Sequence, residues 1–160
     1  MPVKEPVNAC PFCRKECTEN HFLSSDHFVA IYNISPILPG HSLVIPKKHI
    51  ESLVQLSDAD LCEMMLFARK VTKVLKTVFN GDGFDWTVQD GISAGQTVPH
   101  VHLHIIPRKL HDLPESNEWY SLISDNEHRI LDSRNREKLS ERDYTEITTM
   151  LRKATNSLQV

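Results

Sequence analysis

The sequence predicts an α+β domain with an antiparallel sheet of about five strands, a long helix packed on the sheet and a second helix near the C-terminus. Short runs rich in β-branched and aromatic residues end at proline or glycine, whereas residues 57–79 repeat their apolar side chains with the period of a helix. The chain has 160 residues, which suits one core. We expect one domain over residues 1–160, with its core at about residues 8–110 and a C-terminal extension over residues 111–160.

Four segments have the composition or alternation of strands: residues 27–34, 42–45, 84–89 and 100–106. A turn at Pro39–Gly40 separates the first two, so they can pair as antiparallel neighbours. We expect Pro46 and Pro107 to end the second and the fourth, because proline lacks the N–H group that a strand ladder uses. Residues 90–98, which include two glycines, are expected to form a loop.

The clearest helix covers residues 57–79. Ser57 is the expected N-cap, and Asn80–Gly81 supplies the stop signal. Apolar side chains at helical spacing are expected to face the core, namely Leu61, Met64, Met65, Ala68, Val71, Leu75 and Val78. We expect Cys62, on the same helix, to be a small apolar filler.

The region after Lys109 is irregular and charged, and it carries little chemical information. We expect a short helix over residues 115–123 and a mobile segment over residues 124–137. The apolar spacing of residues 140–158 predicts a second amphipathic helix.

The charge and composition exclude several classes of protein. The net charge is −3 and the isoelectric point is about 6.3, so we expect no broad electrostatic binding of nucleic acid. No apolar run approaches the ~20 residues that a membrane span needs. Residues 1–9 lack the apolar region of a signal peptide, and a cytoplasmic location, or a nuclear one, is expected.

Three histidines alternate with apolar residues in the segment from His100 to His104. Because alternate residues of a strand share a face, His100, His102 and His104 should line one side of the sheet while Val101 and Leu103 enter the core. A merely exposed polar face is one alternative. A metal site built from all three is another, but residues at this spacing are spread over ~13 Å, too far for them to share one ion unaided.

The neighbours of these histidines favour phosphate chemistry. The sixteen residues from Gln89 to His104 closely resemble the signature of the histidine-triad (HIT) superfamily, in particular its fragile-histidine-triad branch of dinucleoside polyphosphate hydrolases. The segment from Asn33 to Val44 resembles the other half of the same pocket, and the resemblance covers about residues 25–109. It implies a HIT-like fold. The phosphoramidase branch more often has Asn-Glu-Gly in place of Gln89-Asp90-Gly91.

The resemblance also implies roles for individual residues. It implies a nucleophile at His102, phosphate contacts at Gln89, Gln96 and His104, and a ribose contact at Asn33. His102 would attack the α-phosphorus of diadenosine tri- or tetraphosphate, and water would then release a nucleoside monophosphate from a covalent nucleotidyl-histidine. His100 completes the triad, and Gln89 is also a candidate for contact with the leaving group.

The loop before the triad offers backbone donors. Gly95 lets the chain approach a phosphate closely, so the N–H groups of Gly95, Gln96, Thr97 and Val98 are candidate phosphate ligands. His41 either orders the triad or is simply a packed, hydrogen-bonded histidine.

Two other uses of the fold remain open at the level of the sequence. One is a nucleoside phosphoramidase or a nucleotidyl transferase that hands the nucleotide to phosphate, and the other is a nucleotide-binding signalling module. The charged substrate of a hydrolase would bring Mg²⁺ or Mn²⁺ with it. The resemblance further implies a two-fold homodimer formed through the long helix and the triad-side strand.

Cysteines near the N-terminus suggest a metal site. Cys10 and Cys13 form a C-x₂-C pair, which in a reducing compartment points to metal before disulfide. Zinc-bearing members of the superfamily complete such a site with histidines that correspond to His49 and His100. The resemblance therefore implies a tetrahedral structural zinc with no open position. Free thiols are the alternative, and Cys17 is expected to be a bystander.

Overall fold

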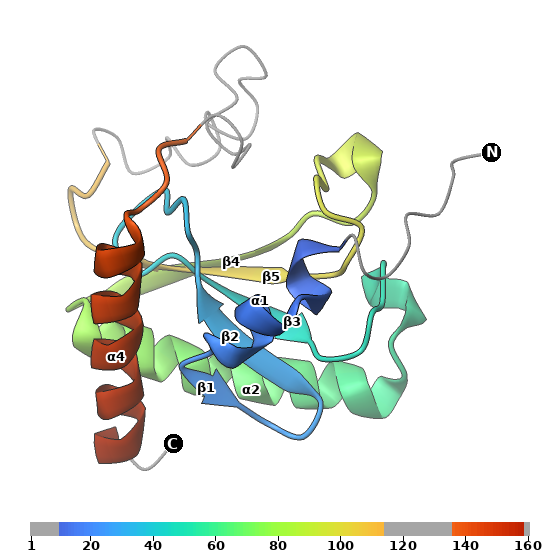
Figure 1. Cartoon of the computed structure of the whole chain (residues 1–160), viewed down its shortest axis with the longest axis horizontal. Coiled ribbons are helices and arrows are strands. Elements are labelled where there is room, and N and C mark those ends of the chain that lie inside the picture. Colours follow the sequence, from blue (N-terminus) through green and yellow to red (C-terminus); the bar gives the residue numbers. More distant parts are fainter. Residues whose placement is uncertain (1–9, 114–135, 159–160) are drawn as a thin grey trace.

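The computed structural model describes residues 10–113 and 136–158, and it confirms the predicted α+β fold (Figure 1). The elements in chain order are η2 (Pro11–Cys13), α1 (Lys15–Glu19), β1 (Leu23–Ser24), β2 (Phe28–Tyr32), β3 (Ser42–Pro46), η3 (Leu53–Gln55), α2 (Asp58–Val78), β4 (Gly83–Val88), η4 (Ile92–Ala94), β5 (Leu103–Arg108) and α4 (Glu141–Leu158), where η marks a 3-10 helix. The five strands form one antiparallel sheet in the order β1-β2-β3-β5-β4.

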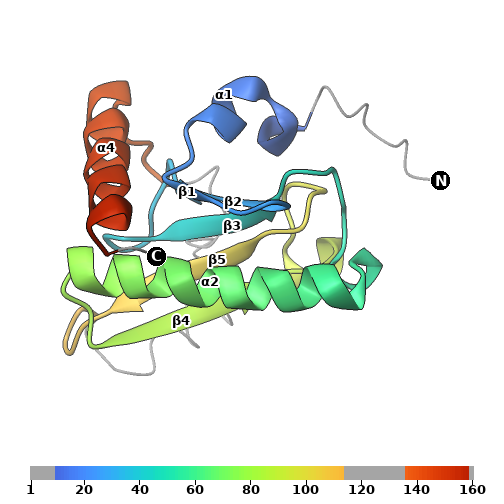
Figure 2. The ribbon, with the colours of Figure 1, turned by 90° about the horizontal axis from the view of Figure 1, so that it is seen from below.

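The two faces of the sheet have different covers. Alternate residues of β2, β3 and β5 form the main core with α2 and α4, and Phe28, Val44 and Ile105 are fully buried there. The opposite face presents a smaller apolar cluster, which packs against Phe12 and Cys17 in the N-terminal segment. Figure 2 shows the long α2 running along one side of the sheet and α1 on the other. The N-terminal segment therefore lies on the face away from α2.

The strand predicted over residues 100–106 is shifted. It begins at Leu103, because the N–H group of Val101 donates to the carbonyl of Ile50 at 2.7 Å instead of joining the sheet ladder. It also continues through Pro107, which was wrongly expected to end it. The pairing of β5 with β3 stops at Ile105, so Pro107 pairs only with β4 and its missing N–H costs no bond to β3. The two-residue strand β1 was not predicted.

Helix α2 begins and ends as predicted. Ser57 caps it by accepting a hydrogen bond from the N–H group of Asp60 at 3.1 Å. Of the seven expected core residues, Met64, Ala68, Val71 and Leu75 are buried, Leu61 and Val78 are half-buried, and Met65 is exposed, which makes that assignment wrong. The buried stripe extends to Phe67 and Val74, because α4 packs against α2. Cys62 is exposed and fills no core space, contrary to expectation.

Helix α4 confirms the predicted C-terminal helix. The hydroxyl of Ser140 caps it by accepting from the N–H group of Asp143 at 3.1 Å, and Leu151 is fully buried in the main core. The predicted helix over residues 115–123 and nearly all of the predicted mobile segment over residues 124–137 lie outside the described residues. No helix in the described part is long and apolar enough to cross a membrane.

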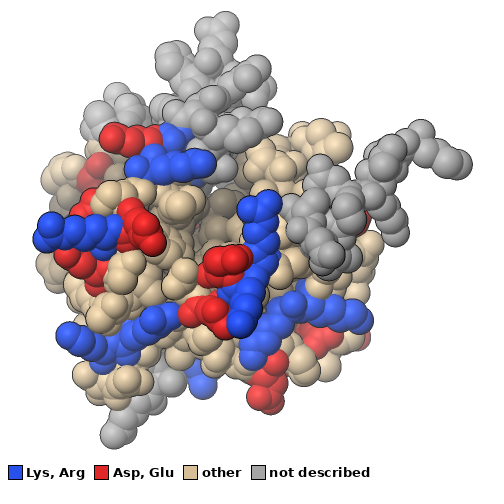
Figure 3. Space-filling view, in the orientation of Figure 1, with Lys and Arg blue, Asp and Glu red and all other residues tan. Residues whose placement is uncertain are grey.

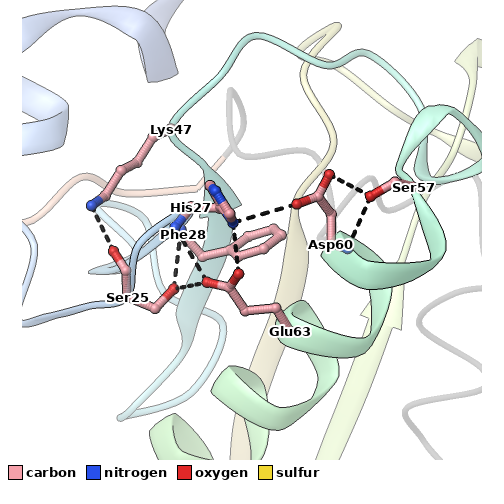
Figure 4. Close-up of polar contacts among 7 residues, drawn as sticks. All are labelled: Ser25, His27, Phe28, Lys47, Ser57, Asp60 and Glu63. Atoms are coloured by element: carbon pink, nitrogen blue, oxygen red, sulfur yellow. Dashed lines mark hydrogen bonds and ion pairs between the residues drawn. The ribbon is translucent and has the colours of Figure 1, made fainter.

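An exposed polar network joins the start of α2 to the turn between β1 and β2 (Figure 4). The carboxylate of Glu63 accepts from the hydroxyl of Ser25 at 2.6 Å and lies 2.7 Å from Nδ1 of His27. Asp60 lies 3.4 Å from the same ring nitrogen, and Lys47 donates to the carbonyl of Ser25 at 2.6 Å. This network fixes the position of the helix N-terminus on the sheet.

Candidate active site and metal centre

Four histidines lie side by side on the face of the sheet away from α2. They are His100, His102, His104 and His41, and we call them the histidine row. The ring centroids of His102 and His104 are 4.9 Å apart, and those of His104 and His41 are 5.2 Å apart. Leu103 enters the main core while His104 lies opposite Leu43 of β3, which belongs to the other face. The alternation predicted from the sequence therefore holds at the start of β5.

The backbone fixes which nitrogen of His102 carries its proton. Nδ1 of His102 lies 2.7 Å from the carbonyl oxygen of His100, and because a carbonyl only accepts, Nδ1 must donate. Burial lowers the pKa of His102, so the ring stays neutral near pH 7. The lone pair is therefore on Nε2, which leaves this nitrogen as the nucleophilic atom.

A second chain of hydrogen bonds fixes the proton of His104. The N–H group of Ile37 donates to Nδ1 of His41 at 3.1 Å, so the proton of a neutral His41 is on Nε2. That nitrogen lies 2.9 Å from Nδ1 of His104, which must then accept. The proton of His104 is consequently on Nε2, which is buried and has no hydrogen-bond partner among the described residues.

Both of these rings are neutral. Burial, together with the positive charge of Arg136, lowers the pKa of His41 to about 3. Burial and the neighbouring His41 lower the pKa of His104 well below its usual value. The row thus combines a nitrogen lone pair on His102 with an N–H donor on His104, the two groups that an in-line attack on phosphorus uses.

Asn33 directly follows β2 and reaches the far end of the row. Its side chain is buried, and its Oδ1 accepts from the N–H group of Ser35 at 2.9 Å. Its Nδ2 lies 3.3 Å from Nε2 of His41. The structure therefore brings Asn33 beside His41, and its contact with a ribose remains a prediction.

The loop between β4 and β5 is shaped by glycine. Gly95 has φ = +90°, and a Cβ atom there would lie 2.8 Å from the side-chain nitrogen of Gln89, so only glycine fits without strain. The amide of Gln96, expected at the phosphate, instead holds this loop together: it accepts from the N–H group of Gly91 at 2.6 Å and donates to the carbonyl of Glu51 at 2.8 Å. The backbone N–H group of Gln96 also donates within the loop, to the carbonyl of Gly91 at 3.1 Å, and its contact with a phosphate remains a prediction.

The rest of the loop is fixed at both ends. The carbonyl of Val98 accepts from the N–H group of His100 at 2.8 Å, whereas Thr97 is exposed. Asp90, a residue to which the sequence analysis gave no role, accepts from the hydroxyl of Ser52 at 2.9 Å and from the N–H group of Leu53 at 2.6 Å. The loop is therefore held against η3.

The four residues expected at the metal site come together. The side-chain ligand atoms of Cys10, Cys13, His49 and His100 all lie within 4.8 Å of one another. Sγ of Cys13 is 3.2 Å from Nδ1 of His49 and 3.5 Å from Nδ1 of His100. A tetrahedral zinc ion with ordinary bond lengths places sulfur and nitrogen ligands about 3.5 Å apart. The quartet could therefore hold a metal ion of that size.

The protonation chemistry of the quartet agrees with this fit. Nε2 of His100 donates to the carbonyl of Pro46 at 3.0 Å, so the lone pair of its neutral ring is on Nδ1, facing the two thiols. Burial raises the pKa of Cys13 to about 11. The thiol is thus neutral unless a cation displaces its proton. Cys17 lies outside the quartet and packs against the smaller apolar cluster, as a bystander would.

Phe12 connects the metal quartet to the histidine row. Its ring meets the rings of His100 and His102 edge-on, with centroids 5.8 Å and 5.2 Å away. No role was expected for Phe12 from the sequence, although its place inside the C-x₂-C pair required it to lie near the two cysteines. The segment of the C-x₂-C pair therefore covers one side of the His102 ring with an apolar surface.

Comparisons with known proteins agree with this site. The family model for the HIT domain matches residues 14–111. The chain is 46% identical over 98 residues to the bis(5'-nucleosyl)-tetraphosphatase [asymmetrical] of Schizosaccharomyces pombe, covering 61% of this chain and 54% of that protein. It is 40% identical over 102 residues to the bis(5'-adenosyl)-triphosphatase of Dictyostelium discoideum, covering 64% of this chain and 68% of that protein. The match thus spans only about half the length of the first relative.

A solved structure has the same architecture over nearly the whole chain. It is a hypothetical histidine triad nucleotide-binding protein from Sulfolobus tokodaii, with a TM-score of 0.72 and 29% identity, and the match covers 94% of each chain. The family model covers more than half of the present chain, including β5 and the histidine row. The chain belongs to the HIT domain family.

Proposed function

We propose that the protein hydrolyses dinucleoside polyphosphates of the diadenosine tri- or tetraphosphate type, with Nε2 of His102 as the nucleophile. The observation that carries this proposal is the 2.7 Å contact between Nδ1 of His102 and the carbonyl of His100, which leaves the lone pair on Nε2. The names of the two relatives, a tetraphosphatase and a triphosphatase, support the substrate class.

The reaction proceeds in two displacements. Nε2 of His102 forms a bond to the α-phosphorus while the bond from that phosphorus to the bridging oxygen breaks, and the electron pair leaves with the remaining phosphates. The Nε2–H group of His104 donates to an oxygen of the reacting phosphate and so stabilises the charge that develops there. Water then attacks the phosphorus and breaks its bond to nitrogen. A nucleoside monophosphate is released, and His102 is restored.

Contacts around the reacting phosphate come from two loops. The N–H groups of Gly95 and Gln96 donate within the loop, to the carbonyls of Ile92 at 3.0 Å and Gly91 at 3.1 Å. The backbone N–H groups of Thr97 and Val98, together with the side chain of Gln89, bind phosphate oxygens. Asn33 contacts the ribose from the other side. The side chain of Gln89 lies directly beside Gly95, in the space that a larger residue at position 95 would fill. This position beside the loop supports the proposal that Gln89 and the loop bind the same phosphate.

Zinc is the metal that we assign to the cysteine and histidine quartet, since two thiolates and two imidazoles suit its tetrahedral preference. With four protein ligands, a bound zinc ion would have no open position and would take no part in the reaction. It would hold His100, whose carbonyl orients His102. Mg²⁺ or Mn²⁺ would enter with the substrate, bound to its phosphates.

A homodimer is also proposed. Among the described strands, β5 lies between β3 and β4, so the strand that carries His104 has no free edge. Its neighbour β4 is the edge strand on that side of the sheet. Phe84 of β4 and the side chains of Met65 and Leu66 on α2 are exposed apolar groups. Light scattering after size exclusion tests the assembly: a mass of one chain would contradict it.

The test of the function is product analysis. Wild type and His102→Ala are incubated with diadenosine tri- and tetraphosphate, with and without added phosphate. We expect the wild type to release AMP and the variant to lose activity by about 10⁴-fold or more while remaining folded. An exposed histidine serves as the matched control, and His27→Ala should retain activity. Turnover by His102→Ala near that of wild type would overturn the proposal. With diadenosine tetraphosphate, whose hydrolysis gives AMP and ATP, ADP in place of AMP on addition of phosphate would identify a transferase.

A further inference from the structure

The segment that leads into α4 lies against the loop that follows β2. Nε of Arg136 donates to the carbonyl of Ser35 at 2.6 Å, and the N–H group of Leu139 donates to the carbonyl of Ile34 at 2.9 Å. Figure 1 shows the start of this C-terminal segment beside the loop between β2 and β3. A residue from outside the matched family region is thereby brought to the loop that carries Asn33.

Hydrogen bonds and one close contact between Asn33 and His41 connect Arg136 to the histidine row. The N–H group of Ser35 donates to Asn33, the amide of Asn33 lies 3.3 Å from His41, and His41 lies 2.9 Å from His104. Because Arg136 holds the carbonyl of Ser35, it stands at one end of this line. The metal quartet and His100 stand at the other end, with His102 between them.

Arg136 supplies positive charge where the row itself has none. Burial is the main cause of the low pKa of His41 and His104, and the charge of Arg136 lowers both further. Among the described residues it is the only lysine or arginine that contributes to these two shifts. Figure 3 shows a hollow near the centre of the view, with both basic and acidic side chains beside it. The buried hydroxyl of Ser35 has no hydrogen-bond partner among the described residues.

We infer that Arg136 binds the phosphates of the leaving group, beyond the phosphorus that His102 attacks. An in-line displacement places the leaving group opposite the attacking Nε2 of His102, and Arg136 lies on the side of the row away from His102. A planar guanidinium matches phosphate oxygens in geometry and charge, which neutral histidines do not. This inference rests on the proposed function. Through Arg136, the C-terminal segment contributes to the selectivity of the protein for the length of the phosphate chain.

The test compares two substrates that differ in their leaving group. Diadenosine triphosphate has a charged leaving group, whereas adenosine 5′-phosphoramidate has a single phosphate and no phosphate beyond it. For Arg136→Gln we expect kcat/KM with the first substrate to fall about ten- to hundredfold, as the loss of a charged hydrogen bond implies. With the second, the change should stay below about twofold. Arg142→Gln, a matched loss of one exposed charge on α4, should affect neither.

Two further measurements separate a binding role from a structural one. Arg136→Lys keeps the charge and should recover part of the loss with diadenosine triphosphate. An equal loss on both substrates in Arg136→Gln would show that the residue only tethers the segment, and no loss on either would also overturn the inference. Calorimetric titration with inorganic tripolyphosphate distinguishes a binding role of Arg136 from a structural one even if the wild type cleaves neither nucleotide. Weaker binding by Arg136→Gln than by Arg142→Gln would support the inference, whereas equal affinity or no binding to wild type would contradict it.

Discussion

The histidine row and the network around His27 use the same side chain in opposite ways. In the row, His41 and His100 are fully buried, and burial lowers the pKa of His41 to about 3 and that of His100 to about 4. His27 lies at the surface, where its hydrogen bond to Glu63 raises its pKa. Both regions join distant segments of the chain, but only the first removes its rings from water.

This difference shows how the fold can give a neutral histidine one defined free ring nitrogen. A carboxylate beside a histidine raises the pKa of the ring, so a ring-nitrogen lone pair becomes free only at a higher pH, as for His27 beside Glu63. A histidine braced by a carbonyl in a buried site stays neutral with a defined free nitrogen, as His102 does. The chemistry follows from the groups that surround each ring, and the following substitutions test that conclusion.

The largest effect is expected where the row meets the metal quartet. Cys13→Ser removes one ligand, so the remaining three should hold zinc weakly, and folding should lose several kcal/mol, because metal binding contributes directly to folding. Metal analysis after chelator treatment should find about one zinc per chain in the wild type and none in the variant. Cys62→Ser makes the same chemical change at an exposed site and should alter neither value. Identical zinc content in wild type and Cys13→Ser would contradict the site.

The buried histidines of the row predict that the free energy of unfolding falls in acid. A histidine whose pKa is lowered by folding binds its proton only after unfolding, so stability falls as pH drops below the unfolded value of about 6.5. For His41 this loss continues toward its folded pKa of about 3, at up to about 1.4 kcal/mol per pH unit. In urea unfolding between pH 7 and pH 5, His41→Phe should therefore lose stability less steeply than wild type. Parallel curves would mean that His41 is not held neutral by the fold.

A smaller, opposite pH dependence is expected at the surface. The raised pKa of His27 means that its contribution is fully present below the unfolded pKa near 6.5 and is lost as pH rises through the folded value. Glu63, whose pKa is lowered first by its hydrogen bond from Ser25, loses its contribution only as pH falls through its own depressed value. Urea unfolding of wild type and His27→Gln should differ most near pH 5.5 and converge near pH 9. A gap that widens with rising pH would refute the ion pair.

Local patterns predicted the fold and much of the site. The alternation from His100 to His104, the cap at Ser57 and the C-x₂-C pair are each encoded within a few residues, so they could be read directly. The quartet needed the family resemblance as well, because nothing in the spacing of His49 relative to Cys13 shows that they meet 3.2 Å apart.

Contacts between distant segments account for what the sequence did not predict. The shifted start of β5 follows from the bond between Val101 and Ile50, and the buried face of α2 depends on α4. The approach of Arg136 to Ser35 joins residues 101 positions apart. Such pairings depend on the tertiary fold, and a single sequence carries no local signal for them.

The proposed chemistry depends most on the position of one proton in each of two rings, those of His102 and His104. Long-range ¹H–¹⁵N correlation spectra of the histidine rings at pH 7 measure these positions directly. We predict neutral rings with the proton on Nδ1 of His102 and on Nε2 of His104. A proton on Nε2 of His102, or an imidazolium signal from that ring, would leave no free nucleophile and would contradict the proposed chemistry. A neutral His104 with its proton on Nδ1 would also contradict it, because the donor to the phosphate would be lost.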